Sequence, residues 1–384
     1  MNGKKKTPSA QHLLQEKVRD ANLCTGCGAC VNLCPYQAAY KDKIVILNDC
    51  DLQGGRCYAF CPRTPTSLES LKEKLFDPKD LTPEIGAIKS YHITRSTDEN
   101  IRSQAQHGGT VTTLMKLALE QGIIDGAILA EGEGNLLAHG KTVTDPAEVI
   151  KFSKSKFINS SIVAEFHNAA KTDLQKLGAV AQPCQALALA KMRMKPIADN
   201  DANIDKLKLV VGLFCGWSLS WRDLSRLIES KANLESLFGM DIPPSKYKIL
   251  ELYTKQGTLE VSIDEVAACV NNACKSCFDM TAEFSDISVG SARLDEGWEV
   301  AKGWNQVIVR TDLGQQLIDL ALSKGLLEER SIPEGNLDKL KWASMNKKKM
   351  AVECLSNISG TCQDLIYLDC RDPVLCTLLP ENQA

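Results

Sequence analysis

Cysteines are the residues of this sequence whose type and spacing could do chemistry. The chain of 384 residues contains 16 of them, and seven fall between residues 24 and 61. Four of these seven form a C-x2-C-x2-C-x3-C-P run, namely Cys24, Cys27, Cys30 and Cys34, which is followed by Pro35. In this spacing three thiolates wrap one iron–sulfur cubane and the fourth turns away to ligate a second cluster. The run therefore predicts iron–sulfur chemistry.

The first cluster needs a fourth ligand from elsewhere, and Cys61, which precedes Pro62, is its natural partner. We expect the first [4Fe-4S] cluster to be held by Cys24, Cys27, Cys30 and Cys61. Gly26 and Gly28 fit this site because the backbone must pass close to sulfide. The module is ferredoxin-like. Zinc is the alternative for paired cysteines, but zinc sites usually need only four ligands in two pairs.

The second N-terminal site is less regular. It has only three thiolates, Cys34, Cys50 and Cys57. Gly54 stands about where a fourth cysteine would be expected. Either a non-thiolate ligand such as Asp49 or Asp51 completes this site, or it holds a three-iron cluster, and the sequence leaves both open.

A separate set of cysteines lies farther along the chain, namely Cys184, Cys215, Cys274 and Cys277. A C-x2-C pair plus two distant cysteines at strand ends can close around one more cubane. Equally, Cys184 and Cys215 could be buried as small apolar side chains. Cys269 is another candidate ligand for this cluster. The last four cysteines match no ligand pattern and are expected to be packing or surface thiols, some at a subunit interface: Cys354, Cys362, Cys370 and Cys376.

Two polar segments could bind an anion. Gly108, Gly109 and Thr110 begin an expected helix over residues 110–121, where free N–H groups, a hydroxyl and the helix dipole suit a flavin pyrophosphate. The pattern is not Gly-x-Gly-x-x-Gly, and a tight turn is the alternative. Ser155 and Lys156 follow another lysine before a second helix, although such a run is usually a solvated surface. His107 and His167 are expected to be structural.

Hydrophobic periodicity after residue 90 alternates between helix and strand. We expect helices over 162–177 and after Thr311, strands over 123–130, 179–181, 207–215, 286–289 and 307–309, and a hairpin over 247–263. The predicted fold class is α+β, with an N-terminal ferredoxin-like iron–sulfur module followed by a mixed α/β flavin-binding domain. The predicted boundaries are 1–68 for the module, 69–90 for a linker, 91–345 for the flavin and cluster domain, and 346–384 for a tail.

Composition limits the partners. Lys and Arg nearly balance Asp and Glu, which gives a net charge of -3, and no nucleic-acid partner is expected. No apolar run is long enough for a membrane helix, and the polar, basic start resembles no targeting segment, so neither membrane insertion nor export is expected. Because disulfides are rarely retained in the cytoplasm, a cytoplasmic location leaves the thiols to bind metal or do redox work.

Several blocks together are similar to one known family. They lie between about residues 107 and 311: Gly108-Gly109-Thr110, Ser155-Lys156-Phe157, Gln182-Pro183-Cys184-Gln185, Leu213-Phe214-Cys215, Ala273-Cys274-Lys275-Ser276-Cys277, Ala282-Glu283-Phe284-Ser285-Asp286 and Gly303-Trp304-Asn305-Gln306. With them the chain resembles the beta subunits of coenzyme F420-reducing hydrogenases and F420-dependent formate dehydrogenases. Gln182, in place of a small residue, and Phe278, between Cys277 and Asp279, depart from the family pattern beside the expected cofactors.

The resemblance implies cofactors and their contacts. Its members bind FAD beside a [4Fe-4S] cluster, which makes Cys184, Cys215, Cys274 and Cys277 the expected cluster ligands. The implied flavin contacts are Gly108, Gly109, Thr110, Ser155, Lys156, Gln182 and Pro183. No acid–base or nucleophile constellation is apparent, so no catalytic side chain is expected.

The resemblance also implies a function. We expect FAD to exchange hydride with coenzyme F420 or NAD(P)H, and two or three 4Fe-4S clusters to carry single electrons to a partner subunit of hydrogenase, dehydrogenase or reductase type. A flavin-free iron–sulfur adaptor or docking subunit is the alternative, and a zinc-held scaffold is a third.

Overall fold

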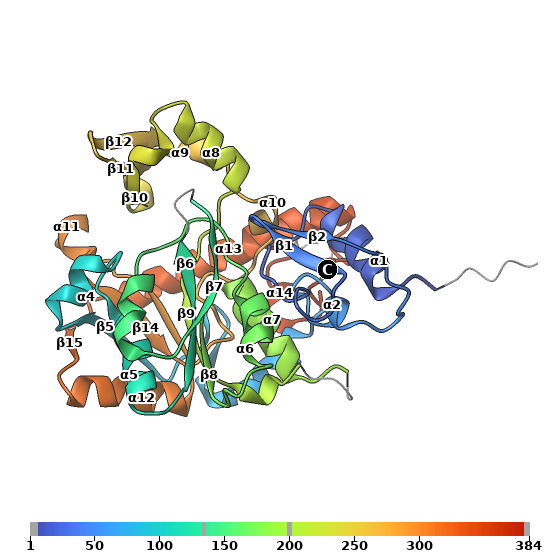
Figure 1. The fold of residues 1–384 in the computed structure, drawn as a ribbon, viewed down its shortest axis with the longest axis horizontal. Helices are drawn as coiled ribbons and strands as arrows, with labels where there is room; N and C mark the ends of the chain where they lie inside the picture. Colours follow the sequence, from blue (N-terminus) through green and yellow to red (C-terminus); the bar gives the residue numbers. More distant parts are fainter. Residues whose placement is uncertain (1–6, 133–135, 198–201, 380–384) are drawn as a thin grey trace, which may run out of the picture.

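An eight-stranded mixed sheet organises the chain (Figure 1), and its strand order is β15-β5-β14-β13-β9-β8-β6-β7. This computed structural model describes residues 7–132, 136–197 and 202–379. In chain order the strands are β5 (Ser90–Ser96), β6 (Gly126–Gly132), β7 (Ala138–Val143), β8 (Leu177–Ala181), β9 (Leu207–Leu213), β13 (Ile287–Ser291), β14 (Asn305–Val309) and β15 (Leu327–Arg330). Strands β6, β8, β9 and β13 are parallel to one another. Their carboxyl ends therefore meet at one edge of the sheet.

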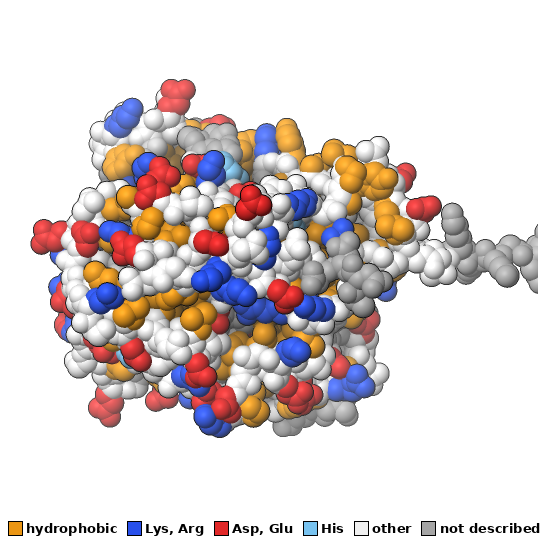
Figure 2. All heavy atoms as spheres, turned by 60° about the horizontal axis from the view of Figure 1, so that its bottom comes forward, with side chains coloured by type: hydrophobic (Ala, Val, Ile, Leu, Met, Phe, Trp, Pro, Cys, Tyr) orange, Lys and Arg blue, Asp and Glu red, His pale blue; other side chains and the backbone are white. Residues whose placement is uncertain are grey.

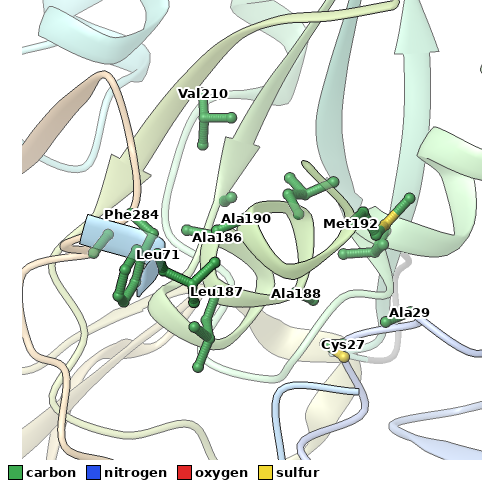
Figure 3. Close-up of a cluster of buried hydrophobic side chains, with 14 of the residues drawn as sticks. Cys27, Ala29, Leu71, Ala186, Leu187, Ala188, Ala190, Met192, Val210 and Phe284 are labelled. Atoms are coloured by element: carbon green, nitrogen blue, oxygen red, sulfur yellow. The ribbon is translucent and has the colours of Figure 1, made fainter. Parts of the chain in front are cut away.

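Helices cover both faces of this sheet. On one face lie α5 (Thr110–Glu120) and α12 (Asp312–Ser323), and on the other lie α6 (Ile162–Ala169) and α7 (Pro183–Arg193). Side chains alternate across a strand, so Val210 and Val211 of β9 enter different cores. Figure 3 shows the α7 side, where Val210 and Leu187 belong to the same core as Cys27. The long apolar runs of β8 and β9 follow from this burial on both faces.

The N-terminal module is small and has few apolar residues of its own. It contains α1 (Ala10–Leu14), a π-helical turn η1 (Gln15–Arg19), a hairpin of β1 (Gln37–Tyr40) and β2 (Lys43–Ile46), and α2 (Arg56–Ala59). Its core, which includes Leu14, Val18 and Leu23, is completed by Ala164 of α6. The module therefore depends on the larger domain for part of its packing.

Residues 69–90, predicted as a linker, carry structure of their own. They include α3 (Leu68–Leu75), a short 3-10 turn η2 (Pro78–Asp80), and the small strands β3 (Leu81–Thr82) and β4 (Gly86–Ala87). Leu71, Phe76 and Ala87 belong to the core on the α7 side of the sheet. This segment is packed rather than extended.

A smaller three-stranded sheet stands beside the carboxyl edge of the large one, at the top of Figure 1. It consists of β10 (Leu237–Asp241), β11 (Ile249–Thr254) and β12 (Gly257–Ser262), with α8 (Trp221–Glu229) and α9 (Ile263–Ala267). The predicted hairpin is confirmed, because β11 and β12 pair with Thr254 opposite Gly257. This small subdomain has its own core, which includes Leu224, Leu250 and Val266.

The C-terminal part begins with a long helix, α13 (Asn336–Ser359), which runs through the predicted boundary at residue 345. The remaining short helices are α4 (Glu99–Gln104), α10 (Asn272–Lys275), α11 (Trp298–Ala301) and α14 (Pro373–Cys376), and short 3-10 turns occur at Pro146–Phe152, Ile204–Lys206, Leu234–Ser236 and Ser245–Tyr247. After α13 the chain returns to the N-terminal module, where Leu368 forms an isolated β-bridge with Thr66. Leu375 of α14 belongs to the same core as Phe60, which directly follows α2.

Most predicted elements occur, with shifted ends. Helix α5 and its end at Gly122, which has φ +63°, are confirmed. The helix expected over 162–177 stops at Ala169, because Thr172 turns its hydroxyl back onto the Ala169 carbonyl at 2.7 Å. The mixed α/β architecture is confirmed, and over the described ranges no helix is both long and apolar enough to cross a bilayer.

Exposed apolar side chains gather on the N-terminal module. Tyr40, Leu47 and Leu52 are 58 to 63% exposed there. The space-filling view in Figure 2 shows a group of apolar side chains at the right, where this module lies, and mixed charges elsewhere. Such a grouping is typical of an interaction surface.

The contact between the module and α6 leaves no room at Gly28. A Cβ at this residue would lie 2.7 Å from the Ala164 nitrogen, and its φ is +86°. We expect Gly28→Ala to lower the free energy of unfolding by about 3 kcal/mol or more, because overlap adds to backbone strain. Gly122→Ala, at φ +63° but with open space around it, should cost only about 1 kcal/mol. Denaturant unfolding of both variants checks this, and equal losses would contradict the close approach.

Candidate functional site

The four thiols predicted to hold the first cluster lie together. Cys27, Cys30 and Cys61 are buried and Cys24 is partly exposed. Burial, followed by the neighbouring Cys61, raises the pKa of Cys27 to about 12. Burial also raises the pKa of Cys30, and Cys24, Cys27 and Cys61 add to the rise. Thiols that affect one another in this way are close in space, so we name these four the first set.

The three thiols of the irregular site also lie together and form the second set. Burial is the main reason that the pKa of Cys57 is raised, and Cys34 and Cys50 contribute to the rise. Cys34 is exposed, while Cys50 and Cys57 are partly exposed. Asp49 and Asp51 are exposed at the surface, so a carboxylate ligand and a three-iron site both remain open.

The third set brings together four cysteines that are far apart in sequence. Burial raises the pKa of Cys215 above its ordinary value, and Cys274, Cys184 and Cys277 add to this effect while Lys347 opposes it. Cys269 is not part of the set. It is buried in the core of the small subdomain, where its sulfur lies 3.9 Å from the Glu265 carbonyl oxygen.

Local structure positions the third set. Cys184 occupies the first turn of α7, which begins at Pro183 after a capping box in which the Gln182 N–H donates to Gln185 Oε1 at 2.8 Å. Cys215 lies two residues after the end of β9, and its N–H donates to the Met280 carbonyl. Asn271 caps α10, which carries Cys274. The Gln-Pro-Cys-Gln block thus has a structural reason, because it fixes a thiol at a helix start.

The first and third sets are neighbours. Burial is the main cause of the raised pKa of Cys184, and the next largest is Cys27 of the first set. Burial alone would also raise the pKa of Cys277, but Arg63 and Lys347 outweigh it and lower this pKa. Two cationic side chains, Arg63 and Lys347, therefore lie near Cys277 of the third set. Sequence reasoning did not single out either residue.

Single metal ions and cubanes require different arrangements of their ligands. Within residues 7–132, 136–197 and 202–379, no three His, Cys, Asp or Glu side chains converge as a mononuclear site requires. A cubane binds each thiolate through a different iron, so its sulfurs stand farther apart.

A buried ionic network fixes the loop that follows Cys277. Lys348 of α13 pairs with Glu283, and both side chains are 1% exposed. The fully buried Arg310 donates to the carbonyl oxygens of Ile85 at 2.6 Å and Thr281 at 3.0 Å. Burial, followed by Glu283, raises the pKa of Asp279 to about 6. The segment that was predicted as a C-terminal tail therefore contributes a buried residue, Lys348, to the core.

A large pocket opens at the carboxyl edge of the parallel strands, between the sheet and the small subdomain. Its volume is about 1150 Å³. Ligands of open α/β sheets bind in this position. Six of the predicted site residues line it, namely Gly109, Thr110, Ser155, Lys156, Gln182 and Cys215, while Gly108 and Pro183 are not among the lining residues. Phe157, Trp217 and Trp342 add aromatic surface to its wall.

The glycine loop at one side of the pocket is held by protein contacts. Gly109 has φ +80°, and a Cβ on Gly108 would lie 2.8 Å from Asn305 Oδ1. The Thr110 N–H donates to Asn305 Oδ1 at 3.2 Å, and its hydroxyl pairs with Thr94 at 2.9 Å. Backbone conformation and packing account for both glycines, and the Thr110 hydroxyl is already engaged within the protein.

Lys156 supplies positive charge at the pocket. Burial, followed by the nearby Lys154, lowers the pKa of Lys156. Its Nζ donates to the Ser153 carbonyl oxygen at 3.3 Å. Among the residues that the structure describes, no carboxylate pairs with this ammonium. An anionic ligand would therefore relieve an unfavourable environment.

Comparison with known proteins identifies the family. Two family models, for the N-terminal and C-terminal parts of the coenzyme F420 hydrogenase/dehydrogenase beta subunit, match residues 91–165 and 174–335. The coenzyme F420 hydrogenase subunit beta of Methanothermobacter thermautotrophicus is 32% identical over 276 residues, which cover 70% of this chain and 94% of that protein. The chain belongs to the family of coenzyme F420 hydrogenase/dehydrogenase beta subunits. The predicted family is thus confirmed.

This family member carries an additional module, because a 4Fe-4S binding domain model matches residues 17–40. A chain from the F420-reducing [NiFe] hydrogenase complex of Methanosarcina barkeri has the same fold, with a TM-score of 0.64, 27% identity and coverage of 72% of this chain and 95% of that one. The coenzyme F420-dependent sulfite reductase of Methanocaldococcus jannaschii is 26% identical over 88% of this chain but only 51% of its own length. The matches to the family models leave residues 1–16, 41–90, 166–173 and 336–384 uncovered.

The surroundings of the half-buried His107 and of the buried His167 favour the neutral imidazole. Burial lowers the pKa of His107 and of His167 to about 4. His167 of α6 contacts the N-terminal module through Nε2, which lies 3.2 Å from the Ala29 carbonyl oxygen. The structural role predicted for His167 fits this contact.

The pH dependence of stability tests this environment. The folded pKa of His167 lies below the ordinary value of 6.5, so the unfolded chain takes up a proton first as the pH falls, and stability is lost. Between pH 7 and pH 5 the wild type should lose about 2 kcal/mol relative to His167→Gln in denaturant unfolding. His12→Gln is the control, because the His12 side chain is 67% exposed. Parallel curves for wild type and His167→Gln would contradict the assignment.

Proposed function

We propose that this chain is the flavin and iron–sulfur electron-transfer subunit of an oxidoreductase complex. Bound FAD would exchange hydride with a two-electron carrier, coenzyme F420 or NAD(P)H, and release single electrons through [4Fe-4S] clusters to a partner subunit. One observation carries the proposal: Cys215 belongs to the third set and also lines the large pocket. A redox ligand in this pocket would lie next to a cluster.

The proposed cluster ligands follow the three sets. Cys24, Cys27, Cys30 and Cys61 would hold one cluster, and Cys184, Cys215, Cys274 and Cys277 another. Cys34, Cys50 and Cys57 would hold a further cluster with a fourth ligand or with three irons. Adjacent sets favour electron transfer, and Cys27 of the N-terminal module is close enough to Cys184 of the pocket domain to raise the pKa of that thiol.

The pocket residues fit FAD in size and chemistry. A volume of about 1150 Å³ exceeds the usual range for drug-sized ligands, as a dinucleotide requires. Phe157 and Trp217 offer apolar and aromatic surface for a ring system, and Lys156 offers charge for a pyrophosphate. His107 also lines the pocket, and its Nδ1 atom is buried without a hydrogen-bond partner among the described residues. A bound ligand could satisfy it.

The names of relatives support the partner and the carrier. Several relatives are named for coenzyme F420. They include the coenzyme F420 hydrogenase subunit beta of Methanothermobacter thermautotrophicus and the F420-dependent formate dehydrogenase subunit beta of Methanocaldococcus jannaschii. We therefore propose F420 as the first carrier to test and NAD(P)H as the second. The exposed Tyr40, Leu47 and Leu52, on the module that contains the exposed Cys34, suit contact with a redox partner.

The decisive experiment is anaerobic purification followed by quantitation of flavin, iron and acid-labile sulfide in one sample. We expect one FAD and roughly eight to twelve irons, as two or three clusters require. Reduction by F420H2 and by NADH is then compared, and the faster reductant indicates the carrier. Iron without flavin would replace the proposal with the adaptor, and zinc without sulfide would refute iron–sulfur chemistry.

The third set is tested by Cys215→Ser. This variant should lose about four irons, one cubane, while the irons of the N-terminal module remain. Cys269→Ser is the matched control, because Cys269 is buried outside the set. Iron and sulfide assays, with EPR of the reduced protein, provide the measurement. Wild-type iron content in Cys215→Ser would remove Cys215 from the cluster and with it the link to the pocket.

The anion-binding role of Lys156 is tested by Lys156→Gln. Loss of the partly buried charge should weaken FAD binding by about tenfold, or about 1.4 kcal/mol. Lys151→Gln is the control, since the Lys151 side chain is 66% exposed and does not line the pocket, and it should change the affinity by less than about threefold. Fluorescence titration of deflavinated protein measures both affinities. Equal affinities for wild type and Lys156→Gln would place the pyrophosphate elsewhere.

A further inference from the structure

Two buried cations lie where the first and third cysteine sets meet. Arg63 is 3% exposed and Lys191 is 8% exposed. Neither forms an ion pair with a carboxylate among the described residues, unlike the buried Lys348, which pairs with Glu283. Burying a charge without an opposite charge is costly, so their positions require another source of negative potential.

Arg63 connects the two sets directly. It follows Cys61 by two residues, and its own N–H donates to the Cys61 sulfur at 3.4 Å. Its guanidinium reaches into the third set, where Nη2 donates to the Ala273 carbonyl oxygen at 3.0 Å and Nη1 to that of Ser276 at 3.4 Å. These two carbonyls belong to the segment that carries Cys274 and Cys277. One side chain of the N-terminal module therefore holds the ligand loop of the other domain.

Lys191 makes the reciprocal connection. It lies on α7, the helix that carries Cys184 at its start. Its ammonium donates to the Cys61 carbonyl oxygen at 2.8 Å and to the hydroxyls of Thr64 at 2.9 Å and Thr66 at 2.8 Å. A charge from the third-set helix thus lies against the ligand loop of the first set.

Tyr367 orients Arg63 from the C-terminal segment. It is fully buried, its hydroxyl donates to the Ser276 carbonyl oxygen at 2.6 Å, and it accepts from Arg63 Nη1. The Arg63 guanidinium carbon also lies 4.5 Å from the centre of its ring. The Tyr367 carbonyl accepts from the Thr66 N–H at 3.0 Å. The arginine is therefore held on several sides.

We propose that Arg63 and Lys191 are positioning residues that raise the reduction potentials of the two clusters on either side of them, so that an electron passes between the N-terminal module and the third set. This inference rests on the proposed function, because the clusters supply the missing negative charge. A cubane with four thiolates is an anion, and it gains one more negative charge on reduction. Nearby fixed cations favour the reduced form.

The test is an EPR-monitored redox titration of the holoprotein with dithionite and mediators. Arg63→Gln should lower the equilibrium constant for one-electron reduction of the third-set cluster by at least about tenfold, a shift of about 59 mV to lower potential. Lys191→Met should lower the potential of the first-set cluster by a similar factor. Arg63→Lys keeps the charge and should stay within about threefold of wild type.

Arg371→Gln is the matched control, because this arginine of the C-terminal segment has an 86% exposed side chain, and its removal should leave both potentials unchanged. Unchanged potentials in Arg63→Gln and Lys191→Met with full iron content would overturn the inference. If Arg63→Gln loses its iron, the potentials of Lys191→Met and Arg63→Lys test the inference instead. A drop in potential of tenfold or more in Arg63→Lys, which keeps the charge, would also overturn the inference. Wild-type protein without iron would instead refute the proposed function.

Discussion

The structure depends on the contact between the cysteine-rich module and the helices α6 and α7. The module has only a small apolar core of its own, and that core borrows Ala164 from α6. Cys27, Ala29 and Phe60 in turn belong to the large core that contains Phe166 and Leu187. Because the two parts share side chains, neither can shift without opening the other. The first and third cysteine sets are therefore held at a fixed separation by packing.

The same contact concentrates polar groups that would be costly elsewhere. Arg63, Lys191 and Tyr367 are all buried there and donate mainly to backbone carbonyls of the cysteine loops, while Nε of Arg63 has no hydrogen-bond partner among the described residues. Such a network fixes a specific geometry, since each donor must keep its acceptor. In addition, the ion pair of Lys348 and Glu283 fixes the loop after Cys277. If these loops hold clusters as proposed, their rigidity would limit the rearrangement that accompanies electron transfer.

Local spacing made the N-terminal cysteine sets predictable, because Cys24, Cys27 and Cys30 follow the spacing typical of ferredoxin cubane ligands. The hairpin around Gly257 and the helix after Gly109 were predictable for the same reason, since turn and helix signals are local. The third set was not, because the fold alone brings Cys184, Cys215 and Cys274 together. Its prediction needed the family resemblance.

Other features of the site were missed because their sequence signals point elsewhere. Lys348 lies within a run of three lysines, which is typical of an exposed face, yet its partner Glu283 is 65 residues away and buried. Strand β5 contains Thr94 and Ser96, which are completely buried although polar residues in a sequence usually indicate an exposed position. Arg63 and Lys191 each look like ordinary surface cations. Only the tertiary fold shows that they face cysteine loops from the opposite domain.

The bond between Arg63 and Tyr367 joins residues 304 positions apart, and it has a consequence for biogenesis. All eleven cysteines of the three sets have been synthesised once Cys277 has been added, but the segment that covers their junction follows roughly 90 residues later, on the order of ten seconds at usual rates of translation. During this interval the nascent chain presents complete thiol sets without their lid. Under the proposed ligation, clusters would have to reach the junction in this interval, before the C-terminal segment docks.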